Sequence, residues 1–309
     1  MDEKFEFLPD DFEFVGDKVD ITKDQVAPAK SAWKDGLSRF FKNKGAVVGL
    51  ICILVITLLA IFAPIISNYK FDEINTTMMN IKPCAEHLFG TDAYGRDLWT
   101  RLWYGTRYSL FIAVVAIFID VVIGMTYGLV SGYFGGVVDS VLQRIQEIIN
   151  SIPTLVILTI LLMVMKSSLF TIIIALSFTE WIGMSRITRA QVLKVKEEEY
   201  VLASRTLGAS DFFIIFKEIL PNIYSQMIIM IMMSIPNAIF YEAYLSFIGL
   251  GLPIPLASLG TLINDGYKSF LVYPYQMVIP VIVFSILMLA FNLFGDGLRD
   301  ALDPTMKEM

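Results

Sequence analysis

The feature of this sequence that most constrains its fold is a set of long segments with almost no charged residue. Six segments qualify: residues 45–69, 108–138, 148–165, 167–185, 219–241 and 269–295. Four of them carry no charge, and the second and fourth carry one acid each, Asp120 and Glu180. A helix needs about 20 mostly apolar residues to cross a bilayer, where only helices and closed barrels satisfy their backbone polar groups. The pattern therefore predicts an all-α, polytopic membrane protein with six transmembrane helices.

The composition favours the bilayer over water as the solvent of this chain. Of the 309 residues, 56% are hydrophobic and 17% are charged, whereas about 25% of residues are charged in soluble domains. A water-soluble fold of this composition would expose large apolar patches that invite aggregation. The composition thus agrees with the six predicted spans.

The net charge of −6 comes from one end of the chain. Residues 1–29 contain nine acidic and three basic residues, and the other 280 residues contain 21 of each sign. A nucleic-acid partner requires a basic surface, and the sequence encodes none, so no nucleic-acid partner is expected. The acidic segment matches no motif and has no assigned role.

Lysine and arginine are distributed unequally between the segments that connect the predicted helices. With the N-terminus in the cytoplasm, cytoplasmic segments from residue 30 onward hold 14 of them and outer segments hold seven. Positive charge favours the cytoplasmic side, so both termini are predicted to be cytoplasmic. The resulting divisions are an acidic tail with a basic juxtamembrane segment (1–44), the first helix (45–69), an outer loop (70–107), a transmembrane region with a cytoplasmic loop at 186–222 (108–296), and a cytoplasmic tail (297–309).

The outer loop carries a helix signal near its end. Leu98 and Leu102, like Trp99 and Trp103, are four residues apart, which predicts an amphipathic interfacial helix over residues 96–108. Upstream, Gly90, Asp92 and residues 95–97 have the composition of turns and a helix cap, and their spacing does not match a metal site.

A second outer segment, residues 249–275, is uncharged at its start but interrupted by glycines and prolines. We expect an outer connection that includes a re-entrant or interfacial piece. A seventh full span is the alternative.

The 186–222 loop is predicted to contain two short helices. The first covers residues 197–207 and stops at Gly208, which tolerates positive φ. Ser210 caps the second, which begins at Asp211 and ends at Pro221 and Asn222. The second helix has an apolar face, Phe212, Phe213, Ile215, Phe216, Ile219 and Leu220. Spacing alone leaves two interpretations open: this face packs on its own bundle, or it docks into a groove of a partner.

Residues 199–221 read EYVLASRTLGASDFFIIFKEILP. They resemble the loop that permeases of ABC importers use to engage their ATPase subunits, with the pattern E-A-A-x₃-G-x₉-I-x-L-P. Four positions match it: Ala203, Gly208, Leu220 and Pro221. Leu202, Ser204 and Glu218 depart from it, replacing Glu, Ala and Ile. The resemblance implies that the ATPase-coupling residues are Tyr200, Ala203, Ser204, Gly208, Ala209, Leu220 and Pro221.

The resemblance extends from about residue 31 to the end of the chain. HLFGTDAYGRDLWTRLWYGTRYSL before the second predicted span, SGYFGG after it, EAYLSFIGLGL at 242–252 and FNLFGDGLRDALDP at 291–304 are all similar to the C-type permease subunit of oligopeptide and dipeptide importers. The resemblance implies a type I ABC-importer permease fold in a bacterial cell membrane. It also implies oligopeptides as the substrate, with dipeptides or nickel chelates as alternatives.

The same resemblance implies a set of partners. These are a homologous second permease subunit, two ATP-binding subunits, and an extracytoplasmic peptide-binding lipoprotein. No GxxxxGK[ST] phosphate-binding loop occurs in the sequence, so ATP hydrolysis is expected in separate subunits and this chain is expected to be a non-catalytic subunit without a cofactor.

Three acids lie in or near predicted spans: Asp120, Glu180 and Glu242. Ionisable groups are costly in a membrane and often mark a transport path. One hypothesis is that they line the translocation path and meet a peptide's ammonium group. The other is that they lie near interfaces, pair with a partner subunit, or stay protonated. Proton sites of an ion-coupled secondary transporter are a less favoured alternative, because the two halves show no internal repeat.

Overall fold

The computed structural model describes residues 32–302, in which every regular element is helical. The α-helices are α1 (Ala32–Lys42), α2 (Lys44–Ile66), α3 (Leu98–Phe134), α4 (Gly136–Asn150), α5 (Thr154–Met165), α6 (Leu169–Thr179), α7 (Trp181–Val195), α8 (Glu199–Thr206), α9 (Asp211–Phe213), α10 (Leu220–Leu245), α11 (Leu259–Lys268) and α12 (Tyr275–Leu302). A 3₁₀ turn, η3 (Thr76–Met78), and two π-helical segments, η4 (Ile214–Ile219) and η5 (Ser246–Leu250), complete them. The acidic segment 1–29 and residues 303–309 of the predicted C-terminal tail lie outside the described residues.

Five helical segments are long and apolar enough to cross a membrane: α2, α3, α6 with α7, α9 through η5, and α12. The sixth is a pair, α4 and α5, which are bent by 76° at the break between them. Counting this pair as one span gives the six that the uncharged segments predict, so the all-α polytopic fold is confirmed.

The break between α4 and α5 lies at Pro153, inside the predicted span 148–165. Proline has no backbone N–H and disfavours the α conformation at the preceding residue, here Ile152. Pro153 is instead the N-cap of α5, where its carbonyl accepts the backbone N–H of Val156. The expectation of one straight helix over 148–165 is therefore wrong, because the proline divides it.

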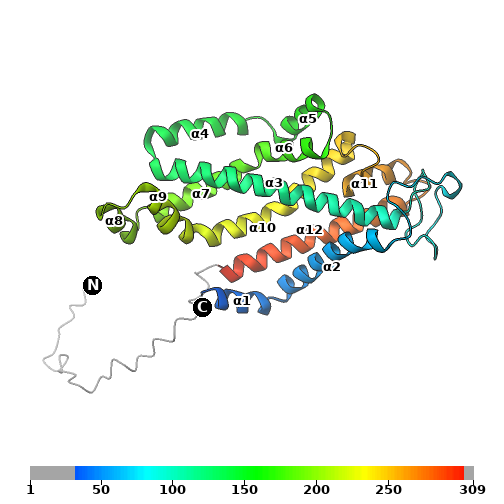
Figure 1. Cartoon of the computed structure of the whole chain (residues 1–309), viewed down its shortest axis with the longest axis horizontal. Coiled ribbons are helices and arrows are strands. Elements are labelled where there is room, and N and C mark those ends of the chain that lie inside the picture. Colours follow the sequence, from blue (N-terminus) through cyan, green and yellow to red (C-terminus); the bar gives the residue numbers. More distant parts are fainter. Residues whose placement is uncertain (1–31, 303–309) are drawn as a thin grey trace, which may run out of the picture.

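The long helices run side by side along the molecule (Figure 1). The helix α4 lies along α3, and α2 and α12 are neighbours. The 186–222 loop, α1 and the end of α12 all lie at one end, and the connection between α2 and α3 lies at the other. This arrangement places the two predicted cytoplasmic termini and the predicted cytoplasmic loop on the same side.

The closest helix pair is α3 with α7, and glycines make it possible. Gly124, Gly128 and Gly132 are four residues apart on one face of α3. A Cβ on Gly128 would lie 2.5 Å from the carbonyl oxygen of Ser185 in α7. Small residues allow helices to approach this closely in a membrane, so α3 and α7 form the rigid centre of the bundle.

The expected interfacial helix over 96–108 is not a separate element. These residues form the first turns of α3, which starts at the cap Asp97 and continues without a break to Phe134. At about 1.5 Å per residue, a 37-residue helix is longer than the bilayer core is thick. Leu102 and Trp103 are buried against α11 and its preceding loop rather than directed into lipid. Likewise, residues 297–302 of the predicted tail continue α12.

The segment after α10 does not contain a seventh span in the described structure. Its one helix, α11, has 10 residues and covers about 15 Å, half of the hydrocarbon core. Ser258 and Thr261 form a capping box at its start. The expectation of a short piece within this connection agrees with α11, and its position relative to the membrane stays a prediction.

Candidate functional site

The 186–222 loop turns sharply at Gly208, which closes α8. The φ angle of Gly208 is +83°, a conformation that glycine adopts without steric cost. Its N–H donates to the carbonyl of Arg205 (3.0 Å), and the N–H of Ala209 donates to the carbonyl of Ser204 (3.1 Å). This pair of bonds is the Schellman arrangement that ends many helices. The predicted stop at Gly208 is confirmed.

The second loop helix begins where Ser210 predicts. The Ser210 side chain accepts the backbone N–H of Phe213 at 3.3 Å, and Asp211 is the first residue of α9. The prediction that Pro221 and Asn222 end this helix is wrong, because α9, η4 and α10 follow one another directly.

Pro221 is accommodated by the wider turn before it. The π-helical segment η4 changes the backbone pairing just before Pro221, which lies in the first turn of α10 where a missing N–H costs least. The Asn222 side chain donates to the carbonyl of Glu218 at 2.6 Å. The second loop helix is therefore continuous with the fifth span and moves with it.

The apolar residues of the loop divide between two faces. Val201, Ile214 and Ile219 have no exposed surface and pack in one core cluster with residues of α3 and α7. Leu207 and Phe212, in contrast, are 88% and 71% exposed. Phe213 and Phe216 are also exposed. Both interpretations of the apolar residues thus apply, each to a different face.

Polar contacts fix the loop to the bundle. Ser204 on α8 donates to Glu218 on η4 at 3.3 Å, which joins the two loop helices. Lys196, at the end of α7, donates to the carbonyl of Gly132 on α3 at 3.0 Å. Arg189 of α7 forms a two-point ion pair with Asp139 of α4, with nitrogen–oxygen distances of 2.6 and 2.5 Å. The loop is therefore held in a defined position.

The seven residues predicted to engage an ATPase line this loop without meeting at one point. Four are exposed and three are partly buried: Tyr200, Ala203, Gly208 and Pro221 in the first group, and Ser204, Ala209 and Leu220 in the second. Burial, together with the carboxylates of Glu198 and Glu218, raises the pKa of Tyr200 above its usual range. Tyr200 therefore remains a neutral hydrogen-bonding group at physiological pH. The predicted set omits the exposed phenylalanines, whose helical spacing was the available signal.

Glu242 lies in a closed polar cluster. It is completely buried, and its two oxygens accept hydrogen bonds of 2.7 Å from Ser109 on α3 and Ser246 on η5. Ser258, the cap of α11, donates to Ser246 at 3.2 Å, and the N–H of Leu259 donates to Ser109 at 3.1 Å. Glu242 thus joins α3, α10 and α11, and in this structure its carboxyl faces no open path.

Asp120 and Glu180 lie apart from that cluster. Asp120 is buried on α3, about 16 Å along the helix axis from Ser109, and its Oδ1 has no hydrogen-bond partner within residues 32–302. Glu180 lies between α6 and α7, close enough to Asp120 for the two carboxyls to interact electrostatically. The structure therefore brings two of the three candidate path residues together and separates the third.

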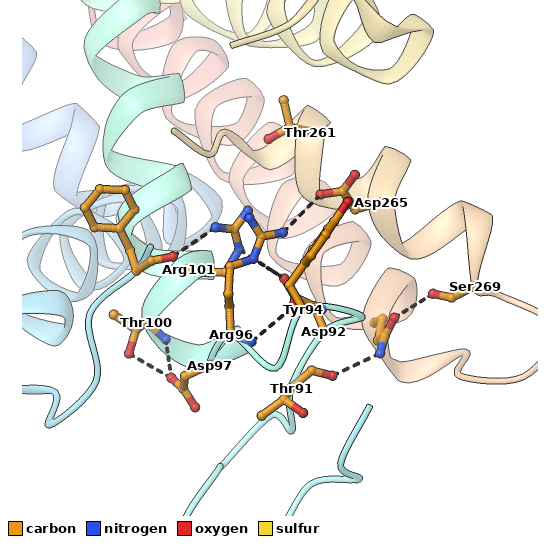
Figure 2. Close-up of polar contacts among 12 residues, drawn as sticks. Thr91, Asp92, Tyr94, Arg96, Asp97, Thr100, Arg101, Thr261, Asp265 and Ser269 are labelled. Carbon is orange, nitrogen blue, oxygen red and sulfur yellow. Dashed lines mark hydrogen bonds and ion pairs between the residues drawn. The ribbon is translucent and has the colours of Figure 1, made fainter. Parts of the chain in front are cut away.

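At the opposite end of the bundle, a buried ionic network holds the outer loop on α3 (Figure 2). Arg96 donates to Asp92 at 2.7 Å and lies 3.8 Å from Asp265 of α11. Arg101 donates to the carbonyl of Phe71 at 2.9 Å and lies 3.5 Å from Asp92. Both arginines are at most 3% exposed. Buried charges must be paired to be tolerated, and here each arginine has a carboxylate.

Further hydrogen bonds extend the attachment to α12. Gln276 donates to the carbonyl of Thr91 at 2.9 Å, and Tyr275 donates to that of Ile81, also at 2.9 Å. Asp97 caps α3 through the N–H of Thr100, as its sequence context predicts. The residues around Asp92 were expected to form turns, and the ionic network was missed, since its partner Asp265 is far away in sequence.

Comparison with known proteins agrees with these features. The profile of a family described as binding-protein-dependent transport system inner membrane component matches residues 124–308. A second profile, the N-terminal TM domain of oligopeptide transport permease C, matches residues 31–83. The chain is 45% identical to the oligopeptide transport system permease protein OppC of Bacillus subtilis (strain 168), over 95% of both chains. It is 42% identical to the dipeptide transport system permease protein DppC of the same strain, over 97% of this chain and 94% of the relative.

Solved structures show the same fold. The chain is similar to the MetNI methionine ABC transporter in inward facing conformations, with a TM-score of 0.54 and 21% identity over 66% of this chain and 96% of the other. It is similar to an amino acid ABC transporter, with a TM-score of 0.50 and 18% identity over 63% of this chain and 91% of the other. The predicted ABC-importer permease fold is confirmed. The chain belongs to the family of binding-protein-dependent transport system inner membrane components.

Proposed function

We propose that this chain is the membrane-spanning permease subunit of an ATP-driven importer, forms half of the translocation path for oligopeptides, and couples to separate ATPase subunits through the 186–222 loop. The observation that carries the proposal is the division of the loop into two faces. Ile214 and Ile219 hold it on the bundle, while Leu207 and Phe212 project outward at the end of the molecule.

The outward face has the chemistry of a docking helix. Phe212 and Phe216 lie next to each other, with ring centroids 4.4 Å apart. A short helix that presents aromatic anchors binds an apolar groove of a partner, and buried aromatic residues supply much of the affinity of such interfaces. The loop lies beyond the apolar spans, so a soluble ATPase can reach it.

The loop is also suited to transmit motion. Its second helix is continuous with α10, and α8 is bonded to that helix through Ser204 and Glu218. A displacement imposed on the exposed face therefore reaches the fifth span directly. Closure of two ATPases on ATP would rock the spans and expose the path alternately to the two sides of the membrane.

Energy is supplied by other chains in this proposal. The sequence contains no GxxxxGK[ST] phosphate-binding loop, so the chain acts as a non-catalytic subunit without a cofactor. Its partners are two ATP-binding subunits, a homologous second permease subunit and an extracytoplasmic peptide-binding lipoprotein. The names of the relatives, which describe oligopeptide and dipeptide transport systems, support peptides as the cargo.

The orientation follows from charge and from the fold. Lysine and arginine favour the side that carries the 186–222 loop, and α1 and the end of α12 lie at that same end (Figure 1). We therefore place both termini in the cytoplasm of a bacterial cell and the ionic network of Arg96 and Arg101 on the outer side.

Uptake by cells that lack the gene for this chain tests the proposal. Cells complemented with the wild-type chain should regain uptake of a labelled pentapeptide, and cells with an empty vector should not. Recovery of only a labelled dipeptide, or only a nickel chelate, would reassign the substrate to one of the alternatives. Recovery of none of the three would reject the proposed transport function.

A further inference from the structure

The helix α1 is fixed to the bundle by one face. The buried ring of Phe40 contacts the ring of Phe294 in α12, with centroids 5.4 Å apart. A Cβ on Gly36 would lie 3.2 Å from the carbonyl oxygen of Ala301, so the two backbones are close. Asn43 then caps α2, and its side chain lies 3.5 Å from that of Asp300. α1 is therefore held where the first span begins.

The opposite face of α1 is apolar and uncovered within the described structure. Leu37 and Phe41 are 60% and 57% exposed. Exposed apolar residues continue every three or four positions along α2: Val48, Ile51, Val55, Leu58 and Phe62. Because α2 is a membrane span, its exposed apolar face contacts lipid acyl chains. The exposed face of α1 is continuous with this lipid-facing stripe.

Basic residues lie at the same boundary. Lys42 and Lys44 are exposed beside Phe41, and the sequence adds Lys34 and Arg39. The acids nearby are Asp35 and, at the end of α12, Asp296 and Asp300, next to Arg299. Five bases against three acids leave a net positive charge. A basic amphipathic helix that begins a span is the pattern of a segment bound at the headgroup region.

We propose that α1 is an anionic-lipid-binding anchor, with Leu37 and Phe41 among the outer acyl carbons and Lys42 and Lys44 against negatively charged headgroups. A subunit of the transporter, or the chain's own acidic residues 1–29, are the other possible occupants of this face. Lipid is favoured because the apolar stripe is shared with α2. The proposal does not depend on which cargo is transported.

Lipid contact is measured with a fluorophore on Phe41→Cys, in a Cys52→Ser, Cys84→Ser background that retains peptide uptake. The assembled transporter is placed in vesicles of equal phosphatidylglycerol and phosphatidylcholine, with one or the other lipid brominated as a quencher. A label on Leu54→Cys, exposed in the middle of α2, reports lipid contact away from headgroups.

The proposal predicts that both labels are quenched, and that only the label at position 41 is quenched more strongly by brominated phosphatidylglycerol. Each lysine near the surface contributes about a fivefold preference for anionic lipid. Lys42→Gln with Lys44→Gln should therefore reduce the preference at position 41 towards one. Lys70→Gln with Lys82→Gln, exposed residues at the opposite end, makes the same charge change and should leave it intact.

Two outcomes would overturn the proposal. Absence of quenching at position 41, with normal quenching at position 54, would show that protein covers this face. Equal quenching at position 41 by the two lipids, unchanged by the Lys42 and Lys44 substitutions, would show that the helix has no preference for anionic lipid.

Discussion

The hydroxyl of Tyr133, near the end of α3, donates a hydrogen bond of 2.6 Å to the carboxylate of Asp211, the first residue of α9. The guanidinium of Arg205 on α8 lies 5.5 Å from the centroid of the same ring. One buried side chain of a span therefore contacts both helices of the 186–222 loop. In the proposed function, this contact joins movement of the loop to movement of the second span.

Replacing Tyr133 with Phe should weaken coupling while it retains the ring. Hydrogen bonds to charged groups contribute about 1.5–3 kcal/mol, so we expect severalfold less peptide transported per ATP hydrolysed by the reconstituted transporter. Tyr127→Phe is the matched control, because that hydroxyl donates to the carbonyl of Leu142 on α4, away from the loop. An equal loss in both variants would contradict a specific role for Tyr133.

Gly208→Val should uncouple ATP hydrolysis from transport while the protein remains in the membrane. The positive φ of Gly208 costs a β-branched residue more than the roughly 1–2 kcal/mol typical of the left-handed region, although space around its Cβ position is open. Gly208→Asn is the control, since Asn tolerates this conformation. The measurement is ATPase activity and peptide uptake in the same vesicles. Normal coupling in Gly208→Val would show that the turn does not need its observed geometry.

Phe216→Ala should weaken association with the ATPase subunits. An aromatic anchor at an interface contributes about 2 kcal/mol or more when it is truncated, which corresponds to roughly thirtyfold in affinity. The measurement is binding of purified ATPase to the permease in detergent. Phe170→Ala, an exposed phenylalanine on α6 outside the loop, should bind normally. Normal binding by Phe216→Ala would place the docking surface elsewhere.

Glu242→Ala should lower the thermal unfolding midpoint of the purified permease. The substitution leaves the buried hydroxyls of Ser109 and Ser246 without their acceptor, at about 1–3 kcal/mol for each unsatisfied group. Glu242→Gln keeps an acceptor and should have a smaller effect. Wild-type stability of Glu242→Ala combined with loss of uptake would instead support the hypothesis that Glu242 contacts substrate.

Asp120→Ser should leave uptake within about twofold of wild type, since a carboxyl that is buried without a hydrogen-bond partner is a cost to the fold rather than a contact it needs. Labelled peptide uptake by cells with equal amounts of permease is the measurement. Complete loss of uptake in a stably folded Asp120→Ser protein would favour the path hypothesis for Asp120.

Local signals in the sequence predicted local structure well. Gly208 and Ser210 act on backbone groups within a few residues of themselves, and both do in the structure what their positions predict. The six spans were predictable because bilayer thickness fixes their length. Pro221 was misinterpreted because the π-helical turn that accommodates it has no recognisable sequence pattern.

Long-range relationships could not be predicted in the same way. The contact of Arg96 with Asp265 joins residues 169 positions apart, and no spacing rule relates them. The cluster around Glu242 likewise depends on how α3 and α11 pack. For the same reason, the sequence named Asp120, Glu180 and Glu242 as one group, while the structure separates Glu242 from the other two.

The most direct test of ATP-driven transport through this chain uses the complete transporter in vesicles. The ATPase subunits carry a substitution of the phosphate-loop lysine, and uptake of a labelled pentapeptide is measured with and without a proton gradient. If the 186–222 loop delivers the work of ATP hydrolysis to the spans, uptake falls to background under both conditions. Uptake that persists with the disabled ATPases, and stops when a protonophore removes the gradient, would contradict it.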